Sequence, residues 1–174
     1  RRLSSMAETM VRMGEYVSSG SSTDVLVSIG LGSCIGLALI DRRRKVAGLA
    51  HIMLPDSSTR SDTTAAGRYA DLAIPAILND LGKLGAQRSM LEAVLVGGAK
   101  MFALGGESLD IGARNNEATR SILHGLRIPI VAAETGGTNG RTIRVYLDGI
   151  RVTSREAGTQ EVVIYDRRTG SQAA

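Results

Sequence analysis

The sequence has very little cysteine and few aromatic residues. Its 174 residues include one cysteine, Cys34, no tryptophan, one phenylalanine and four tyrosines. A single cysteine excludes an intramolecular disulfide, and a chain without disulfides suits a reducing compartment. We therefore expect a cytoplasmic protein whose core is built from Leu, Ile, Val, Ala and Met side chains.

Long hydrophobic runs are also missing. The two arginines at the start are not followed by an apolar segment, so we expect no secretory signal. The longest apolar stretches, residues 35–40 and 46–54, have the length of strands. Spanning a bilayer takes roughly 20 apolar residues, so we expect a protein that is not inserted in a membrane.

Charge of either sign is moderate. The formal net charge is +4, and the most concentrated basic run covers residues 42–45, Arg-Arg-Arg-Lys. One short cluster offers few phosphate contacts, and the chain lacks the stacking aromatics of single-strand binders, which disfavours nucleic acid as a partner. The run fits a solvated turn at a hairpin edge, or a docking point for an acidic partner.

Glycine is abundant, with 21 residues, but no glycine cluster matches a nucleotide-binding motif. The glycines of residues 30–36 have the wrong spacing for a dinucleotide loop, and a strand pattern follows them where a helix is required. Residues 97–100 lack the spacer and the final hydroxyl residue of a phosphate loop. Two histidines and one cysteine, without paired-ligand spacing, give no zinc site. We expect no cofactor and no metal.

Hydrophobic patterning predicts strands that come in runs, with two helices between them. The expected strands are 25–29, 35–40, 46–54, 91–96, 128–134, 142–147, 151–155 and 161–166. The expected helices are 67–84, kinked or begun by Pro75, and a second from a cap at Asn115 or Asn116 to Leu126. This order favours an α+β fold, a layered sandwich of mostly antiparallel β-sheet flanked by helices.

The chain is long enough for one domain with a real core and too short for two. We expect a loose N-terminal leader over residues 1–13, a single domain over 14–166, and a disordered tail over 167–174. Strands 35–40 and 46–54 are apolar on both faces, so we expect them to be buried.

Cys34 and His51 indicate a reactive site only when they are considered together. Alone, each is better explained as a core residue, since free cysteine packs as a small hydrophobe. An antiparallel hairpin that turns at residues 42–43 places Cys34 directly opposite His51. Opposed residues point to the same side with Cβ atoms about 4.5–5.5 Å apart, within reach of a thiol–imidazole contact. A slip by one residue would separate them onto opposite faces.

The pair suits a nucleophilic mechanism. A cysteine attacks an amide as its thiolate, and a nearby imidazole can take and return the proton. The backbone N–H of Cys34, together with a neighbouring N–H, could bind the oxyanion. A third group should orient the histidine ring, and spacing leaves four candidates open: Ser28, Ser33, Asp56 and Asp62.

Several motifs resemble the chemoreceptor glutamine deamidase family, CheD. Two of these motifs contain Cys34 and His51: Ser-Ile-Gly-Leu-Gly-Ser-Cys at residues 28–34 and Ala-His-Ile-Met-Leu-Pro at residues 50–55. The others, in family order, are Gly-Arg-Tyr-Ala-Asp at 67–71, Gly-Gly-Ala-Lys-Met-Phe at 97–102, Ile-Gly-Ala-Arg-Asn at 111–115 and Glu-Thr-Gly-Gly at 134–137. The likeness runs from about residue 14 to residue 166.

The resemblance implies a Cys–His–hydroxyl triad, with Cys34 as nucleophile and His51 as base. The family has a threonine six residues before the cysteine, and this chain has Ser28 there, which keeps the hydroxyl without the methyl that restrains its rotamer. The resemblance also implies a fold similar to toxin-type cysteine deamidases, chemoreceptor cytoplasmic helices as substrate, and a chemotaxis phosphatase, CheC, as a partner in some members. The implied reaction converts receptor glutamines to glutamates through a thioester, with methyl-ester hydrolysis by the same route. The competing hypothesis is a non-catalytic regulator that binds receptors or the phosphatase.

Overall fold

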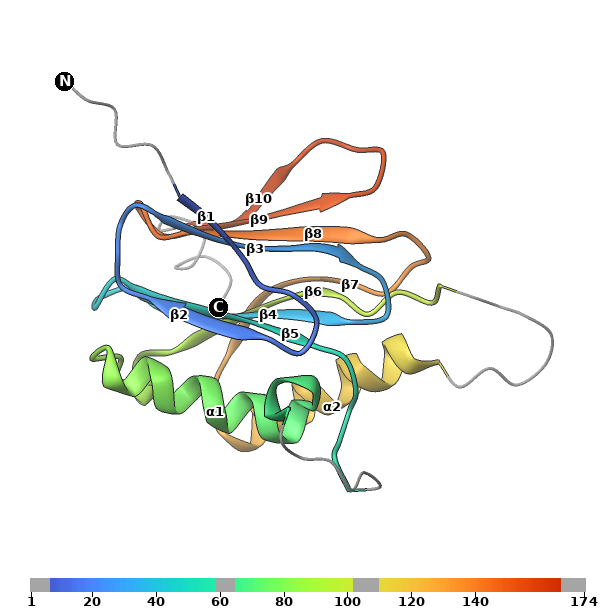
Figure 1. Cartoon of the computed structure of the whole chain (residues 1–174), viewed down its shortest axis with the longest axis horizontal. Helices are drawn as coiled ribbons and strands as arrows, with labels where there is room; N and C mark the ends of the chain where they lie inside the picture. Colours follow the sequence, from blue (N-terminus) through green and yellow to red (C-terminus); the bar gives the residue numbers. More distant parts are fainter. Residues whose placement is uncertain (1–6, 59–64, 102–109, 167–174) are drawn as a thin grey trace.

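The protein folds into three layers, two β-sheets and a pair of helices (Figure 1). The structure is a computed structural model that describes residues 7–58, 65–101 and 110–166. Both helices cover the face of one sheet, and the second sheet packs on its other face (Figure 1). The expected α+β class is confirmed. None of the helices in the described ranges is long and apolar enough to cross a membrane.

The two sheets are each assembled from segments that are far apart in the sequence. Sheet A has the order β1 (Ala7–Met10), β3 (Asp24–Leu31), β8 (Arg141–Tyr146), β9 (Arg151–Glu156) and β10 (Val162–Tyr165). Sheet B has the order β2 (Tyr16–Ser19), β5 (Val46–Ile52), β4 (Ile35–Asp41), β6 (Glu92–Gly97) and β7 (Ile130–Thr135). Pairing is antiparallel except for β1 with β3 and β6 with β7, which are parallel.

Two helices and two short 3₁₀ turns complete the described fold. They are η1 (Ala66–Arg68), α1 (Ala70–Lys83), η2 (Arg88–Met90) and α2 (Ile111–Gly125). Pro75 lies inside α1 and does not mark its start. Among the expected strands, each has a counterpart within a few residues, while β1 and β2 were not expected.

Strands β4 and β5 form the centre of the molecule, and every residue in both is buried. Side chains alternate between the two faces of sheet B, as the pleat requires. Ala38 and Ile40 point into the layer between the sheets, whereas Leu37 and Leu39 pack against the helices. The expectation that these strands are buried on both faces is confirmed.

The register of the β4–β5 hairpin differs from the expected one. His51 is paired with Gly36, not with Cys34, and the hairpin closes at Asp41 and Val46. The cause is the turn, because the buried Asp41 carboxylate accepts the N–H groups of Arg43 and Arg44, both at 3.1 Å, and holds a four-residue turn. The shift moves the partner of His51 by two residues. Cys34 lies outside β4, and it packs against the cluster between the two sheets. Val11 is part of that cluster, and its carbonyl oxygen lies 3.0 Å from the His51 ring, so Cys34 and His51 share this face of sheet B.

The expected loose leader is wrong for residues 7–13. Ala7–Met10 form β1 alongside β3, and Val11 is buried between the sheets with its N–H bonded to the Val27 carbonyl at 2.7 Å. The segment mixes apolar and polar residues without a clear period, so hydrophobic patterning did not reveal it; backbone pairing with β3 holds it. Residues 1–6 and the expected disordered tail, 167–174, lie outside the described residues. The single domain over 14–166 and the relation to toxin-type deamidases stay predictions.

The start of α2 also differs from expectation. The helix begins at Ile111, and its N-cap is Asp110, whose carboxylate accepts the Ala113 N–H at 2.9 Å. Neither Asn115 nor Asn116 is a cap, since both lie within the second turn. An Asp cap satisfies one of the unpaired N–H groups of the first turn and suits the positive end of the helix dipole.

Gly97 permits the closest backbone approach at the edge of the Cys34 loop. Its φ is 114°, and a Cβ added there would lie 2.2 Å from the Cys34 carbonyl oxygen. Only glycine tolerates both the dihedral angle and the contact. The position of Cys34 therefore depends on this residue.

We expect Gly97→Ala to lower the free energy of unfolding by about 2 kcal/mol or more, because the methyl group clashes and φ is left-handed. Equilibrium urea unfolding measures the change. The matched control is Gly82→Ala in α1, where an added Cβ meets nothing within 4 Å. This control should raise stability by about 0.5–1 kcal/mol, as alanine does in helices. Equal effects of the two substitutions would contradict the interpretation.

Candidate active site

His51 is held by the segment that connects β1 and β2. Its Nδ1 lies 3.0 Å from the carbonyl oxygen of Val11. Its backbone N–H donates to the Glu15 carbonyl, and its own carbonyl accepts the Gly14 N–H, both at 2.9 Å. Because a carbonyl oxygen can only accept, Nδ1 carries a proton and the neutral ring has its lone pair on Nε2.

Ser28 reaches the same carbonyl oxygen from the neighbouring sheet. This residue is fully buried in β3, and its hydroxyl donates to the Val11 oxygen at 2.7 Å. The serine and the histidine ring thus converge on one acceptor. Ser28 does not hydrogen-bond the ring itself; the two side chains are connected through Val11.

Asp56, another candidate for orienting His51, is engaged elsewhere. Asp56 is exposed, and its carboxylate accepts from the Ser58 hydroxyl and from the Ser58 N–H, the latter at 3.0 Å. Asp62 lies outside the described residues. The orienting group is the Val11 main-chain carbonyl, which sequence reasoning missed because a backbone acceptor leaves no trace in residue type.

Cys34 lies in the loop just before β4, and backbone hydrogen bonds fix that loop against the end of β6. Gly98 donates its N–H to the Cys34 carbonyl at 2.9 Å, and Ala99 donates to the Gly32 carbonyl at 2.8 Å. These two N–H groups are thereby used within the fold.

A surface cavity of about 440 Å³ opens beside Cys34. Glycines 30, 32 and 112 line part of its wall, and Met13 and Met101 lie at its border with 62% and 42% of their surface exposed. The cavity is large enough for a glutamine side chain and is bordered by flexible apolar side chains, which adapt to a partner surface. Cys34 is partly exposed, while His51 is buried and does not line the cavity.

Both reactive side chains are neutral in this environment. Burial raises the pKa of the Cys34 thiol above its ordinary value. Burial also lowers the pKa of His51, although the Val11 carbonyl and the Glu15 carboxylate oppose the shift. His51 Nε2 is buried and has no hydrogen-bond partner in the described part of the chain, so no hydrogen bond joins it to Cys34. The resting pair is a thiol and an imidazole, not an ion pair.

Asn115 belongs to this site, although helical patterning predicts only a cap. It is fully buried, and its side-chain amide donates to the carbonyls of Ser33 and Met53, each at 2.9 Å. Its place in the Ile-Gly-Ala-Arg-Asn motif is the one signal in the sequence that could have found it. Across the described ranges, no group of three or more His, Cys, Asp or Glu side chains is arranged to hold a metal ion.

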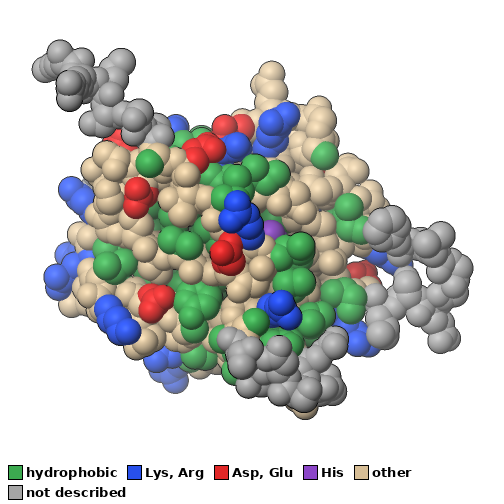
Figure 2. Space-filling view, viewed as in Figure 1, with side chains coloured by type: hydrophobic (Ala, Val, Ile, Leu, Met, Phe, Trp, Pro, Cys, Tyr) green, Lys and Arg blue, Asp and Glu red, His purple; other side chains and the backbone are tan. Residues whose placement is uncertain are grey.

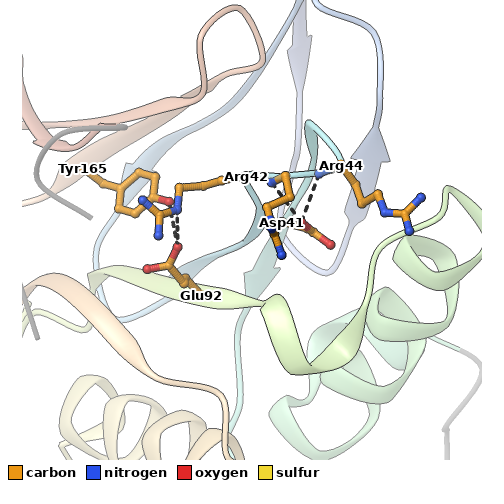
Figure 3. A network of polar contacts seen from close by, with 6 residues as sticks. Asp41, Arg42, Arg44, Glu92 and Tyr165 are labelled. Carbon is orange, nitrogen blue, oxygen red and sulfur yellow. Dashed lines mark hydrogen bonds and ion pairs between the residues drawn. The ribbon is translucent and has the colours of Figure 1, made fainter. Parts of the chain in front are cut away.

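The basic turn lies at the opposite end of sheet B from Cys34. β4 spans Ile35–Asp41, so the turn is roughly 20 Å away at 3.3 Å per residue. Arg42 pairs with Glu92 at 2.7 Å, and Glu92 also accepts the Tyr165 hydroxyl at 3.1 Å (Figure 3). In the space-filling view, Lys and Arg side chains are spread over the visible face, several of them along its left edge (Figure 2). A partner docked there would be far from the cysteine.

Comparison with known proteins identifies the family. A family model described as CheD chemotactic sensory transduction matches residues 53–156. The chain belongs to the CheD family. Relatives named "Probable chemoreceptor glutamine deamidase CheD" include one from Clostridium botulinum strain Eklund 17B, 44% identical over 88% of this chain and 96% of the relative. Another, from Clostridium kluyveri, is 39% identical over 84% of this chain and 93% of the relative. The expected family is confirmed.

The match to the CheD model begins at residue 53, after both Cys34 and His51. Membership of the CheD family therefore does not by itself assign the reactive residues. Their assignment depends on the geometry of the site: a partly exposed thiol that lines a cavity, and an imidazole of fixed tautomer on the same face of sheet B.

We expect iodoacetamide to alkylate Cys34 with a midpoint pH above that of the same protein unfolded in urea, because burial disfavours the thiolate. The rate constant measured from pH 6 to about pH 10 gives both midpoints, and the single cysteine makes the signal unambiguous. A native midpoint below the unfolded one would show a thiolate stabilised at rest and would overturn the neutral-pair description.

Proposed function

We propose that this protein deamidates glutamine side chains of chemoreceptors, with Cys34 as nucleophile and His51 as general base. The observation that carries the proposal is the unpartnered Nε2 of a buried His51, on the same face as a cysteine that opens into a cavity; both lie within the described residues. The names of the CheD relatives supply the substrate class.

The reaction begins from the neutral pair. His51 Nε2 takes the thiol proton as Cys34 Sγ attacks the carbonyl carbon of the glutamine amide. The oxygen becomes an oxyanion near the Cys34 N–H. Collapse of this intermediate breaks the C–N bond, and His51 gives its proton to the departing nitrogen, which leaves as ammonia. A γ-glutamyl thioester then remains on Cys34.

Water completes the cycle by the same proton route. His51 takes a proton from water as the water oxygen attacks the thioester, and the C–S bond breaks. The thiolate recovers the proton from His51, and the product is glutamate. A receptor methyl ester would react through the same thioester with methanol as the leaving group, so methyl-ester hydrolysis belongs to the same proposal.

Ser28 acts on His51 indirectly, through the Val11 carbonyl. Its hydroxyl and the His51 Nδ1 share the Val11 carbonyl oxygen, so Ser28 helps to fix the acceptor that orients the ring. The resemblance supplies a threonine at this position. A threonine hydroxyl could make the same hydrogen bond with a more restricted rotamer.

The partners and compartment follow from the same proposal. The substrate would be the cytoplasmic helices of chemoreceptors, the protein would work in the cytoplasm, and a CheC phosphatase would be a regulatory partner. The second candidate function is a regulator that binds these partners without catalysis. Cys34→Ser separates the two, since a pure regulator would keep its signalling activity and an enzyme would lose it while still forming complexes.

We expect the protein to produce mass gains at glutamines of a purified chemoreceptor cytoplasmic fragment, detected by peptide mass spectrometry. Cys34→Ala should lower the rate by roughly 10³-fold or more, because the thioester route is closed. An unchanged deamidation rate with Cys34→Ala, or no mass gain at glutamines with the unaltered protein, would contradict the proposal. Gly82→Ala, far from the cavity, is the folded control.

We expect Ser28→Ala to lower kcat for the same fragment roughly 10- to 100-fold, because the Val11 carbonyl loses one of its two anchors and the ring is held less well. Ser28→Thr restores the hydroxyl and should match or exceed the unaltered protein. KM should stay within about threefold in both variants, since Ser28 is buried behind His51 and does not reach the cavity. Equal kcat for the alanine and threonine variants would remove Ser28 from the site.

A further inference from the structure

We propose that Asn115 is the positioning residue of this site: its side-chain amide holds the Cys34 peptide and the end of the His51 strand in one fixed relation. The inference rests on the proposed function and adds a residue to it. Asn115 does not touch the cavity and is not a nucleophile, acid or base.

Burial makes the two hydrogen bonds of Asn115 obligatory. The residue has no exposed surface, and its Nδ2 has two hydrogens, one for the Ser33 carbonyl and one for the Met53 carbonyl. A buried NH₂ group without partners is costly, so the side chain has no alternative to this bridge in the folded state. The bridge connects positions separated by 82 and 62 residues along the chain.

The bridge lies where the β4–β5 ladder ends. The last pair of the ladder is Ile35 with Ile52. Just beyond this pair, the Asn115 amide donates to the carbonyls of Ser33 and Met53. Two carbonyl oxygens are both acceptors and cannot bond each other. An NH₂ group between them supplies a donor to each, so Asn115 continues the connection between the two strands beyond the last backbone pair.

On the Cys34 side, the bridge fixes a peptide plane. The Ser33 carbonyl and the Cys34 N–H belong to the same peptide, and in a trans peptide they point in opposite directions. Holding the carbonyl on Asn115 therefore directs the Cys34 N–H away from α2. A hydrogen bond to the carbonyl also polarises the peptide and strengthens its N–H as a donor. This N–H is the one assigned to the oxyanion.

On the His51 side, the bridge holds the chain two residues after the base. Met53 donates its N–H to the Arg68 carbonyl at 2.9 Å, so its peptide groups are held from both directions. His51 is already fixed by residues 11–15 on one side of β5. Asn115 fixes the strand end on the other side, toward β4 and Cys34.

Helix α2 holds the Asn115 side-chain amide in a fixed position, because its first turn packs closely on the backbone of residues 98 and 99. A Cβ added at Gly112 would lie 2.3 Å from the Ala99 carbonyl oxygen and 2.6 Å from that of Gly98. The first turn of α2 therefore touches the backbone segment that also donates to the Cys34 loop. Helix, loop and strand end form one unit, and Asn115 is the side chain at its centre.

Only an amide at this position satisfies both carbonyls. In Asn115→Asp, the isosteric replacement, a carboxylate acceptor would face two carbonyl acceptors, and in Asn115→Ser the hydroxyl would offer one donor in place of two. The matched control is Asn116, the next residue, whose Oδ1 accepts from Arg120 Nε at 2.8 Å. An aspartate there keeps the acceptor, so Asn116→Asp tests the same chemical change without breaking a bond.

The test compares Asn115→Asp, Asn115→Ser and Asn116→Asp on the chemoreceptor fragment. We expect kcat to fall roughly 10- to 100-fold for both Asn115 variants, with the larger loss for aspartate and KM within about threefold. Asn116→Asp should match the unaltered protein. In Asn115→Ser, which adds no charge, the midpoint pH of Cys34 alkylation should fall toward its value in urea, because the loosened loop exposes the thiol.

The outcomes distinguish a failure of the positioning role of Asn115 from a failure of the deamidase proposal. If Asn115→Asp does not fold, as judged by circular dichroism, Asn115→Ser carries the comparison. Unchanged kcat and an unchanged alkylation midpoint in a folded Asn115 variant overturn the positioning role while leaving the deamidase proposal intact. If the unaltered protein does not deamidate the fragment, the proposed function fails, and the alkylation midpoint alone then decides whether Asn115 positions Cys34.

Discussion

The carbonyl oxygen of Val11 is the point on which the site depends. It accepts the Ser28 hydroxyl from sheet A and the His51 ring from sheet B, at 2.7 and 3.0 Å. One backbone atom thus joins the two sheets and sets the tautomer of His51. A main-chain acceptor is well suited to this task, because it is positioned by the strand hydrogen bonds of its neighbours and does not titrate. The ring can therefore change its charge at Nε2 while Nδ1 keeps one partner.

Much of the architecture could be predicted from patterning, for a physical reason. Strands β4 and β5 are apolar on both faces, which marks them as the buried centre, and the order of strands and helices favours the α+β class that is observed. The pairing of Cys34 with His51 was wrong in register and right in face. Turn length is set by the Asp41 carboxylate, which patterning does not see, but a shift by two residues leaves the side of the sheet unchanged.

The parts that could not be predicted share a cause. β1 is held by backbone pairing, Val11 contributes a carbonyl, and Asn115 sits inside a helix where patterning predicts only a cap. Each acts through main-chain hydrogen bonds across long separations, and residue type does not encode the position of a carbonyl group. The candidate catalytic side chains were visible because their chemistry is rare in this chain. The groups that hold them were not, because backbone amides and carbonyls are present at every position.

The wide sequence separations within the bridge at Asn115 have a consequence for the order of events during synthesis. Strands β4 and β5 leave the ribosome early and can pair with each other, but the amide that joins their ends comes 62 residues after Met53. The nascent hairpin therefore carries an incompletely organised cysteine until α2 has emerged and docked. The surroundings of this thiol are therefore completed only in the second half of synthesis, well after the cysteine itself has been made.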